Sequence, residues 1–222
     1  MIGFRIKKVP EHLKVDIKSI PEERANMISH AVGLFLFIIG IPFLIVYTFS
    51  TGVLEYAVGT ILYAVSLLMV YTASTLYHSS YKARIRRKLR IFDHVSIYFL
   101  IAGSYSPFLL THIKTTAGWT IFILLWCMVL IGSIVKLLFV GKFKVVSTMA
   151  YLVMGWLALF IIKPLYLHLP GVSFFWIVTG GILYTAGSFF YLRTEMRFNH
   201  LIWHLFVLAG STSHFIAVCY CV

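Results

Sequence analysis

Long apolar segments alternate with short polar ones along this chain. A membrane-spanning helix needs about 20 predominantly apolar residues. Seven windows meet that requirement, at residues 27–49, 53–78, 91–112, 117–140, 145–167, 171–193 and 200–221. The connections are too short for a second domain. The pattern therefore predicts an all-α integral membrane protein with a basic N-terminal arm (1–24) and one seven-transmembrane-helix bundle (25–222).

Composition supports the membrane class, because 60% of the residues are hydrophobic and 12% are charged. Soluble domains average about 45–50% apolar and about 25% charged residues. The first apolar run begins near Met27, has the length of a spanning helix and is followed by no small-residue cleavage site. We therefore expect it to remain as a helix rather than be removed as a signal peptide. Cys127, Cys219 and Cys221 lack the CxxC spacing of metal sites and are predicted to be small apolar fillers.

Lysine and arginine residues lie mostly on one side of the predicted helices. Seventeen of the 19 precede the first span or lie around the second, fourth and sixth connections, whereas Lys114 and Lys163 fall on the opposite side. Because cytoplasmic loops carry the excess of these residues, the N-terminus is predicted inside and the C-terminus outside. The net charge of +12 then reflects loops that face the cytoplasm and anionic lipid headgroups, with no nucleic acid as partner.

Five polar residues fall at the predicted cytoplasmic ends of three spans. Ser74 and His78 end the second span, Asp93 opens the third, and His200 and His204 open the seventh. Ionisable groups inside a membrane are costly, roughly 2.5–3.5 kcal/mol for Asp, and usually mark function. The spacing of four residues in two of the spans places both side chains on one helix face, with Cβ atoms about 5–6 Å apart.

This set of residues predicts a zinc site. Three imidazoles with an open fourth position are typical of catalytic zinc, so His78, His200 and His204 are the expected ligands. Asp93 could orient the attacking water or act as general base, and Ser74 could donate a hydrogen bond. The histidines could instead bond across helices, and Asp93 could pair with the basic loop. The five residues lie at the same depth in their three spans, which favours a metal site, although the HExxH protease motif is absent.

Glu23, Asn26 and His30 recur at helical spacing at the start of the first span. They could form an outer layer of the metal site or a lip beside it. A helix cap with an interhelical hydrogen bond is an equally open interpretation.

Two further histidines are excluded from the predicted site. His94 adjoins Asp93 but points about 100° away around the helix. His214 lies ten residues beyond His204, which is about 15 Å along a helix and too far to share an ion. We expect it to hydrogen-bond Ser211 or another neighbour.

Taken together, these residues resemble the motifs of the haemolysin III family. Glu23-Arg24-Ala25-Asn26 with Ser29-His30 resembles its first motif, Ser74–His78 its SxxxH element, and His200–His204 followed by His214 its closing HxxxH motif. Asp93 falls where the third helix of the family carries an aspartate. That family is similar to the progestin and adipoQ receptors, which include the adiponectin receptors, within a wider superfamily of proposed membrane hydrolases.

The resemblance implies a seven-helix bundle with its N-terminus inside and zinc held by His78, His200 and His204, with Asp93 beside it. Some relatives are linked to ceramide amide hydrolysis, so the leading hypothesis is a zinc-dependent hydrolase of a lipid amide or ester in the bacterial cell membrane. The chain lacks the long N-terminal region of the receptors, and hormone binding is not carried over. The family name comes from a haemolytic, pore-forming activity.

Two rival hypotheses stay open at this stage. A pore-forming haemolysin would need polar residues along its full path. The polar residues here gather in the inner leaflet, although Thr212, Ser213 and His214 carry polarity deeper. Alternatively, zinc could only clamp the second, third and seventh spans together in a membrane sensor or regulator. The sequence leaves the lipid and the oligomeric state undetermined.

Overall fold

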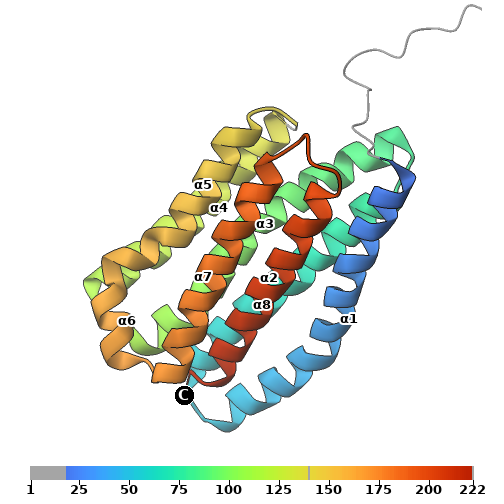
Figure 1. Cartoon of the computed structure of the whole chain (residues 1–222). Helices are drawn as coiled ribbons and strands as arrows, with labels where there is room; N and C mark the ends of the chain where they lie inside the picture. Colours follow the sequence, from blue (N-terminus) through green and yellow to red (C-terminus); the bar gives the residue numbers. More distant parts are fainter. Residues whose placement is uncertain (1–18, 140, 222) are drawn as a thin grey trace, which may run out of the picture.

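A computed structural model describes residues 19–139 and 141–221. The predicted arm at residues 1–24 lies largely outside this range, and its last residues, 20–24, belong to the first helix. The described chain folds as a bundle of helices (Figure 1). They are α1 (Ile20–Ser50), α2 (Leu54–Ser79), α3 (Ala83–His112), α4 (Thr116–Leu138), α5 (Lys144–Trp156), the 3₁₀ helix η2 (Leu157–Ile161), α6 (Ile162–His168), α7 (Gly171–Leu192) and α8 (Asn199–Cys219).

Each predicted span coincides with a helical run, so the prediction of an all-helical bundle is confirmed. Among the described residues, six runs are long and apolar enough to cross a membrane: α1, α2, α4, the continuous stretch Lys144–His168, α7 and α8. The exposed surface is apolar, as for Phe43 and Phe160, which are 73% and 82% exposed. Buried serines such as Ser96 and Ser106 lie inside. This is the arrangement of an integral membrane protein, whose surroundings are lipid.

The helix α3 begins eight residues before the predicted span of 91–112. Its first turns carry the basic residues of the α2–α3 connection, and α3 is not among the six runs that are apolar enough to cross a membrane. Arg86 in this extension is 1% exposed and donates to the carbonyl oxygens of Tyr77 and Ser80, both over 3.1 Å. These bonds fix the start of α3 against the end of α2.

The fifth predicted span is interrupted by η2. Pro164 lacks an N–H group and cannot donate to the carbonyl oxygen one turn earlier, which weakens the α-helical pattern there. The hydroxyl of Tyr105 in α3 donates to the carbonyl oxygen of Gly155 over 2.5 Å and accepts from the backbone N–H of Ala158 over 3.0 Å. Tyr105 therefore supports the helix where its geometry changes.

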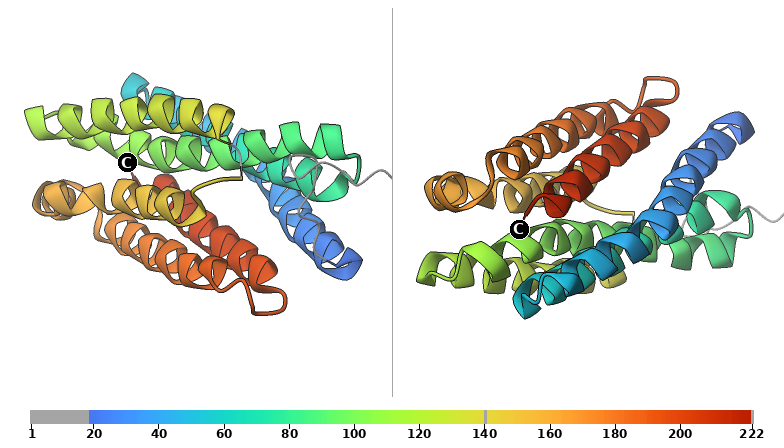
Figure 2. Two further views of the ribbon diagram at one scale, coloured as in Figure 1. Left: turned by 90° about the horizontal axis from the view of Figure 1, so that it is seen from above. Right: turned by 90° about the horizontal axis from the view of Figure 1, so that it is seen from below.

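The helix α2 is the most buried of the spanning runs and packs extensively against α1 and α3, while α7 packs against α8 (Figure 2). Tyr56, Tyr63 and Tyr71 of α2 are fully buried. A Cβ atom added at Gly59 would lie 2.6 Å from Cα of Pro107, so this glycine permits the close approach of α2 and α3. The α2–α3 pair thus forms a firm support for the polar residues at its end.

Candidate metal centre

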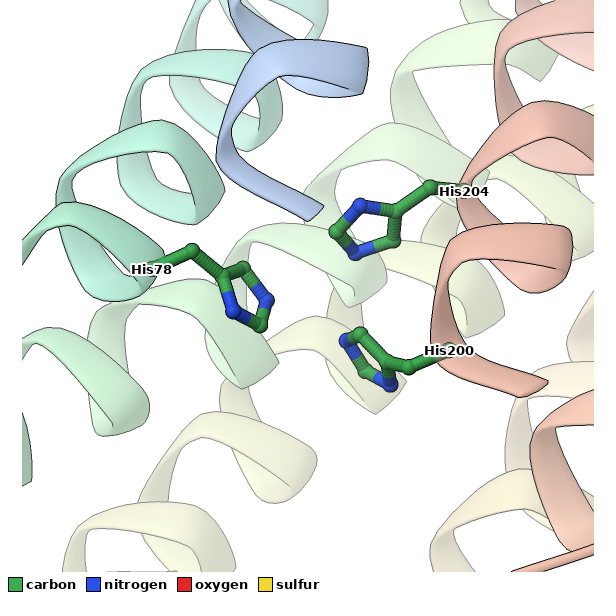
Figure 3. A group of neighbouring side chains, drawn as sticks. All are labelled: His78, His200 and His204. Carbon is green, nitrogen blue, oxygen red and sulfur yellow. The ribbon is translucent and has the colours of Figure 1, made fainter. Parts of the chain in front are cut away.

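The three predicted ligands lie together in the structure. His78 is in the last turn of α2, and His200 and His204 are in the first two turns of α8. Each offers a ligand atom within 4.8 Å of the others. Figure 3 shows the three rings directed toward one another from the two helices. His78 is more than 120 positions from His200 and His204 in sequence. The fold brings these residues of α2 and α8 together.

Glu23 in α1 orients His78. The Nδ1 atom of His78 lies 2.8 Å from Oε2 of Glu23, whose Oε1 accepts from Nη2 of Arg86 over 2.8 Å. All three side chains are buried. A carboxylate paired with arginine is an acceptor, so Nδ1 of His78 carries the hydrogen and donates it. The Nε2 atom is left as a lone-pair donor, and within residues 19–139 and 141–221 it has no hydrogen-bond partner.

His204 is oriented in the same way by α1. Its Nδ1 atom lies 3.0 Å from Oγ of Ser29 and 3.1 Å from the carbonyl oxygen of Asn26. The Ser29 hydroxyl already donates to that carbonyl over 2.8 Å, so both oxygens accept from Nδ1 of His204. Its Nε2 atom therefore also presents a lone pair. The ring of His30 stacks on this imidazole with centroids 3.6 Å apart.

The first turn of α8 is anchored to α1. The backbone N–H of Phe198 donates to Oε1 of Glu22 over 2.8 Å, at a left-handed residue (φ 56°) that turns the chain into the helix. Glu22 also accepts from Ser19 and completes a capping box. Glu22, not Glu23, is therefore the capping residue of α1. The contact of Glu23 with His78 joins α1 to α2, and it fits both interpretations that the sequence left open, an outer layer of the candidate centre and an interhelical hydrogen bond.

The donor set fits a zinc ion. Three imidazoles from two rigid helices are a familiar zinc shell, and the ligating nitrogens of two of them are selected by bonds at the opposite ring atom. The Nε2 atom of His78 is buried and has no hydrogen-bond partner among the described residues. Burying such a polar atom costs free energy, and ligation to an ion would remove that cost.

Ser74 and Asp93 line a cavity of about 100 Å³ together with His200 and His204. Both side chains are buried, at 1% and 7% exposure. The structure thus brings the five predicted polar residues to one place at the end of the bundle.

The same cavity continues away from the histidines between α3, α5, α7 and α8. Apolar and aromatic side chains dominate this part, together with two glycines, and the wall includes Ile97, Leu100, Ile101, Tyr105, Leu152, Gly155, Trp156, Gly181, Tyr184 and Val207. A second cavity of about 80 Å³ shares Tyr105, Gly155, Trp156 and Gly181 with the first and extends to Phe108 and Leu165. The two cavities are therefore neighbours, and both are lined mainly by apolar side chains.

One histidine differs from the sequence-based expectation. His94 lines the cavity beside Asp93, although the helical projection placed it away from the site. This position could not be read from the periodicity of one helix, because the facing helices define the cavity. His214 meets its expectation of a hydrogen bond to Ser211 or another neighbour: its Nε2 lies 3.3 Å from the carbonyl oxygen of Ile177, while Ser211 bonds the hydroxyl of Tyr184.

Apolar helices around a three-histidine cluster, in which His78 and His204 are buried, define an integral helical membrane protein with a candidate metal centre. The sequence model of the family described as Haemolysin-III related matches residues 18–215, and the chain belongs to this family. The family resemblance carried by the sequence motifs is therefore confirmed.

Known relatives align along most of this chain. It is 43% identical over 205 residues to the Hemolysin-3 homolog of Bacillus subtilis (strain 168), covering 92% of this chain and 96% of the relative. Identity to Hemolysin-3 of Bacillus cereus is 42%, over 90% of this chain and 91% of the relative. The Monocyte to macrophage differentiation factor of Homo sapiens is 28% identical, over 89% of this chain and 83% of the relative.

Proposed function

We propose that this protein is a zinc-dependent hydrolase of the bacterial cell membrane that cleaves an amide or ester bond in a lipid. One observation carries the proposal. Three imidazoles converge within 4.8 Å beside a cavity that Asp93 and Ser74 line, and α1 fixes the orientation of two of the three rings. Convergent ligands with an acid and a hydroxyl at the same cavity are the parts that metal-assisted hydrolysis requires.

His78, His200 and His204 would hold the metal, which when bound activates water and polarises a carbonyl group. Asp93 would accept the proton of the attacking water, since its carboxylate is buried in the wall of the same cavity. Ser74 would donate a hydrogen bond to the substrate oxygen on which negative charge develops. Glu23 would keep His78 in its ligating tautomer through the cycle.

The apolar cavity supports a lipid as the substrate. It leads from the candidate centre between α3, α5, α7 and α8, where an acyl chain would be surrounded by side chains such as Ile97 and Leu100. The neighbouring cavity, which shares Tyr105 and reaches Phe108 and Leu165, would lengthen that space for a long acyl chain. Burial of an acyl chain is favourable by about 0.8 kcal/mol for each CH₂ group, so such a channel would select lipids by chain length.

The proposal includes a topology of seven spans, in which α3 crosses the membrane together with the six apolar runs. The N-terminus then lies inside and the C-terminus outside. The basic residues near His78, Asp93 and His200 support it, because positive residues stay on the cytoplasmic side. The hydrolytic centre would then lie in the inner leaflet, close to cytoplasmic water and open to lipid through the apolar cavity.

The deciding experiment is the metal content of the full chain, purified in detergent without added metal. The comparison is a variant with His78, His200 and His204 all changed to Ala, and the control is His168→Ala, an exposed histidine outside the cluster. We expect about one zinc per chain in the wild type and the control, and almost none in the triple variant. Equal, low metal in preparations with native helical circular dichroism would refute the proposal. Lipid amides and esters are then screened for turnover with the zinc-loaded protein.

A structural role for zinc is the first competing function. The ligands come from α2 and α8, so an ion would join two helices that are distant in sequence. In that case chelation would lower the unfolding temperature, and no lipid amide or ester would be turned over at any zinc level. Turnover that disappears with chelation and returns with zinc supports the hydrolase instead.

The second competing function is cytolysis. The name of the Bacillus cereus relative, Hemolysin-3, favours it. It predicts that the purified protein releases a trapped dye from liposomes. The hydrolase predicts intact liposomes at the protein concentrations that give lipid turnover.

A further inference from the structure

A third cavity, of about 120 Å³, borders the candidate centre on the side of the basic connections. His78 and His200 belong to its wall, so it adjoins the proposed metal ligands directly. Four cationic residues from α3, α4, the α4–α5 connection and the start of α5 also line it: Arg90, Lys136, Lys142 and Lys144. We call these four residues the basic vestibule.

Three cations of the basic vestibule, Arg90, Lys136 and Lys142, have no ion-pair partner among the described residues. Glu23 supplies the one carboxylate that the described residues contribute to the wall, and its two oxygens are bonded to His78 and Arg86. Like charges that gather around one cavity repel one another, and a bound anion relieves that repulsion.

Lys136 lies inside the bundle rather than in the surrounding water. It lies in the last turn of α4, where a lysine normally extends its ammonium group to the aqueous interface. Here the side chain is 3% exposed, and Nζ donates to Oγ of Ser147 over 2.6 Å. An ammonium group has three donors, so Lys136 keeps hydrogen-bonding capacity for a ligand of the cavity.

Lys144 is held in place before any ligand binds. Lys144 donates to the carbonyl oxygen of Tyr191 over 2.7 Å, and its Nζ lies 4.2 Å from the centre of the Tyr191 ring. Gly141, at φ +79°, lets the α4–α5 turn approach Arg90, since an added Cβ would lie 3.1 Å from Nη1 of that arginine. Positioned cations bind an anion at a smaller entropic cost than mobile ones.

We propose that the basic vestibule binds the phosphate group of an anionic phospholipid. Basic pockets between membrane helices on the cytoplasmic side are suited to phosphate headgroups, and a guanidinium with several ammonium groups matches the charge and the oxygens of phosphate. Free phosphate has the same chemistry and would occupy the same place. The assignment of an anionic phospholipid as the substrate rests on the proposed function. In that case the headgroup would lie beside the histidines, and the acyl chain would enter the apolar cavity.

The test measures binding by titration calorimetry with the detergent-purified full chain after EDTA treatment. The probes are inorganic phosphate, dihexanoylphosphatidylglycerol and the zwitterionic dihexanoylphosphatidylcholine. The phosphatidylglycerol should bind at least about tenfold more tightly than the phosphatidylcholine, and added salt should weaken its binding. Binding of inorganic phosphate as well would show that the phosphate group suffices. Binding of the phosphatidylglycerol alone would show that the lipid portion contributes.

Variants locate the binding. Lys136→Met, Arg90→Gln and Lys142→Gln should each weaken binding severalfold, and the Arg90–Lys142 double variant at least about tenfold. Lys142 is exposed, so its substitution leaves the folding of the bundle intact. The matched control is Lys88→Gln, an exposed cation on the same helix as Arg90 that does not line the cavity. Unchanged affinity in the double variant, or no binding to folded wild type, would overturn the inference.

The result is independent of the metal. Zinc at one per chain with no phosphate binding would refute the vestibule and leave the proposed centre intact. Phosphate binding that is unaltered when His78, His200 and His204 are all changed to Ala supports the vestibule even if zinc is absent.

Discussion

Glu23 of α1 accepts a hydrogen bond from Nδ1 of His78 in α2 over 2.8 Å, and the same carboxylate pairs with Arg86 of α3. One side chain thus joins three helices and orients a candidate metal ligand. The acidic group of this contact is 55 residues from the histidine in sequence. It places the ligating nitrogen of His78 before any ion binds, which is the function of such outer contacts in metal sites.

Replacing Glu23 tests this orientation. Glu23→Gln retains the shape but loses the charge, so zinc affinity should fall by about 10–100-fold, measured by competition with a fluorescent chelator. Glu23→Ala should in addition destabilise the fold by about 3–5 kcal/mol, because Arg86 would stay buried without its partner carboxylate. Glu55→Gln is the control, since Glu55 pairs with Lys114 at the surface. Wild-type zinc affinity in Glu23→Gln would mean that other contacts orient His78.

Asp93→Asn should separate catalysis from metal binding. The amide cannot accept the proton, so turnover of a lipid amide or ester should fall by about 10²–10⁴-fold while zinc content stays at the wild-type level. Ser96→Ala controls for local disturbance, because the Ser96 hydroxyl bonds the backbone carbonyl of Asp93 over 2.7 Å. Loss of zinc together with turnover would instead identify Asp93 as a ligand or as a residue required for folding.

Leucine at Gly155 or Gly181 should shorten the acyl chain that the protein prefers. Both glycines line the apolar cavity, and an added Cβ atom would meet no other atom within 4 Å at either position. The longer side chain should therefore fill the channel without disturbing the bundle. We expect the ratio of turnover for short and long acyl chains to rise by at least about tenfold. Gly171→Leu, at an equally open position outside the cavity, should leave that ratio unchanged.

The orientation can be measured by cysteine labelling in intact cells. In a background with Cys127, Cys219 and Cys221 changed to Ala, a cysteine at position 163 should react with an impermeant maleimide. A cysteine at position 88 should react only after the membrane is opened, because basic connections stay in the cytoplasm. The reverse pattern would place the candidate centre in the outer leaflet.

The helices, and the end of the bundle at which chemistry is possible, follow from the amino-acid sequence. Apolar length specifies a spanning helix because the membrane leaves no other way to satisfy the backbone. The spacing of four in Ser74–His78 and His200–His204 likewise places each pair on one face. Since short connections force neighbouring helices to run in opposite directions, the depth of these residues followed from the order of the spans. These are local properties, and the structure agrees with them.

Which side chains meet across helices depends on the tertiary structure. The contact of Glu23 with His78, the place of His94 in the cavity wall and the gathering of Arg90 with Lys136 all depend on how helices rotate against one another. Periodicity gives the face of a residue on its own helix but not the partner that this face meets. Rotation is set by side-chain packing, such as the close approach at Gly59, and that packing involves the whole bundle at once.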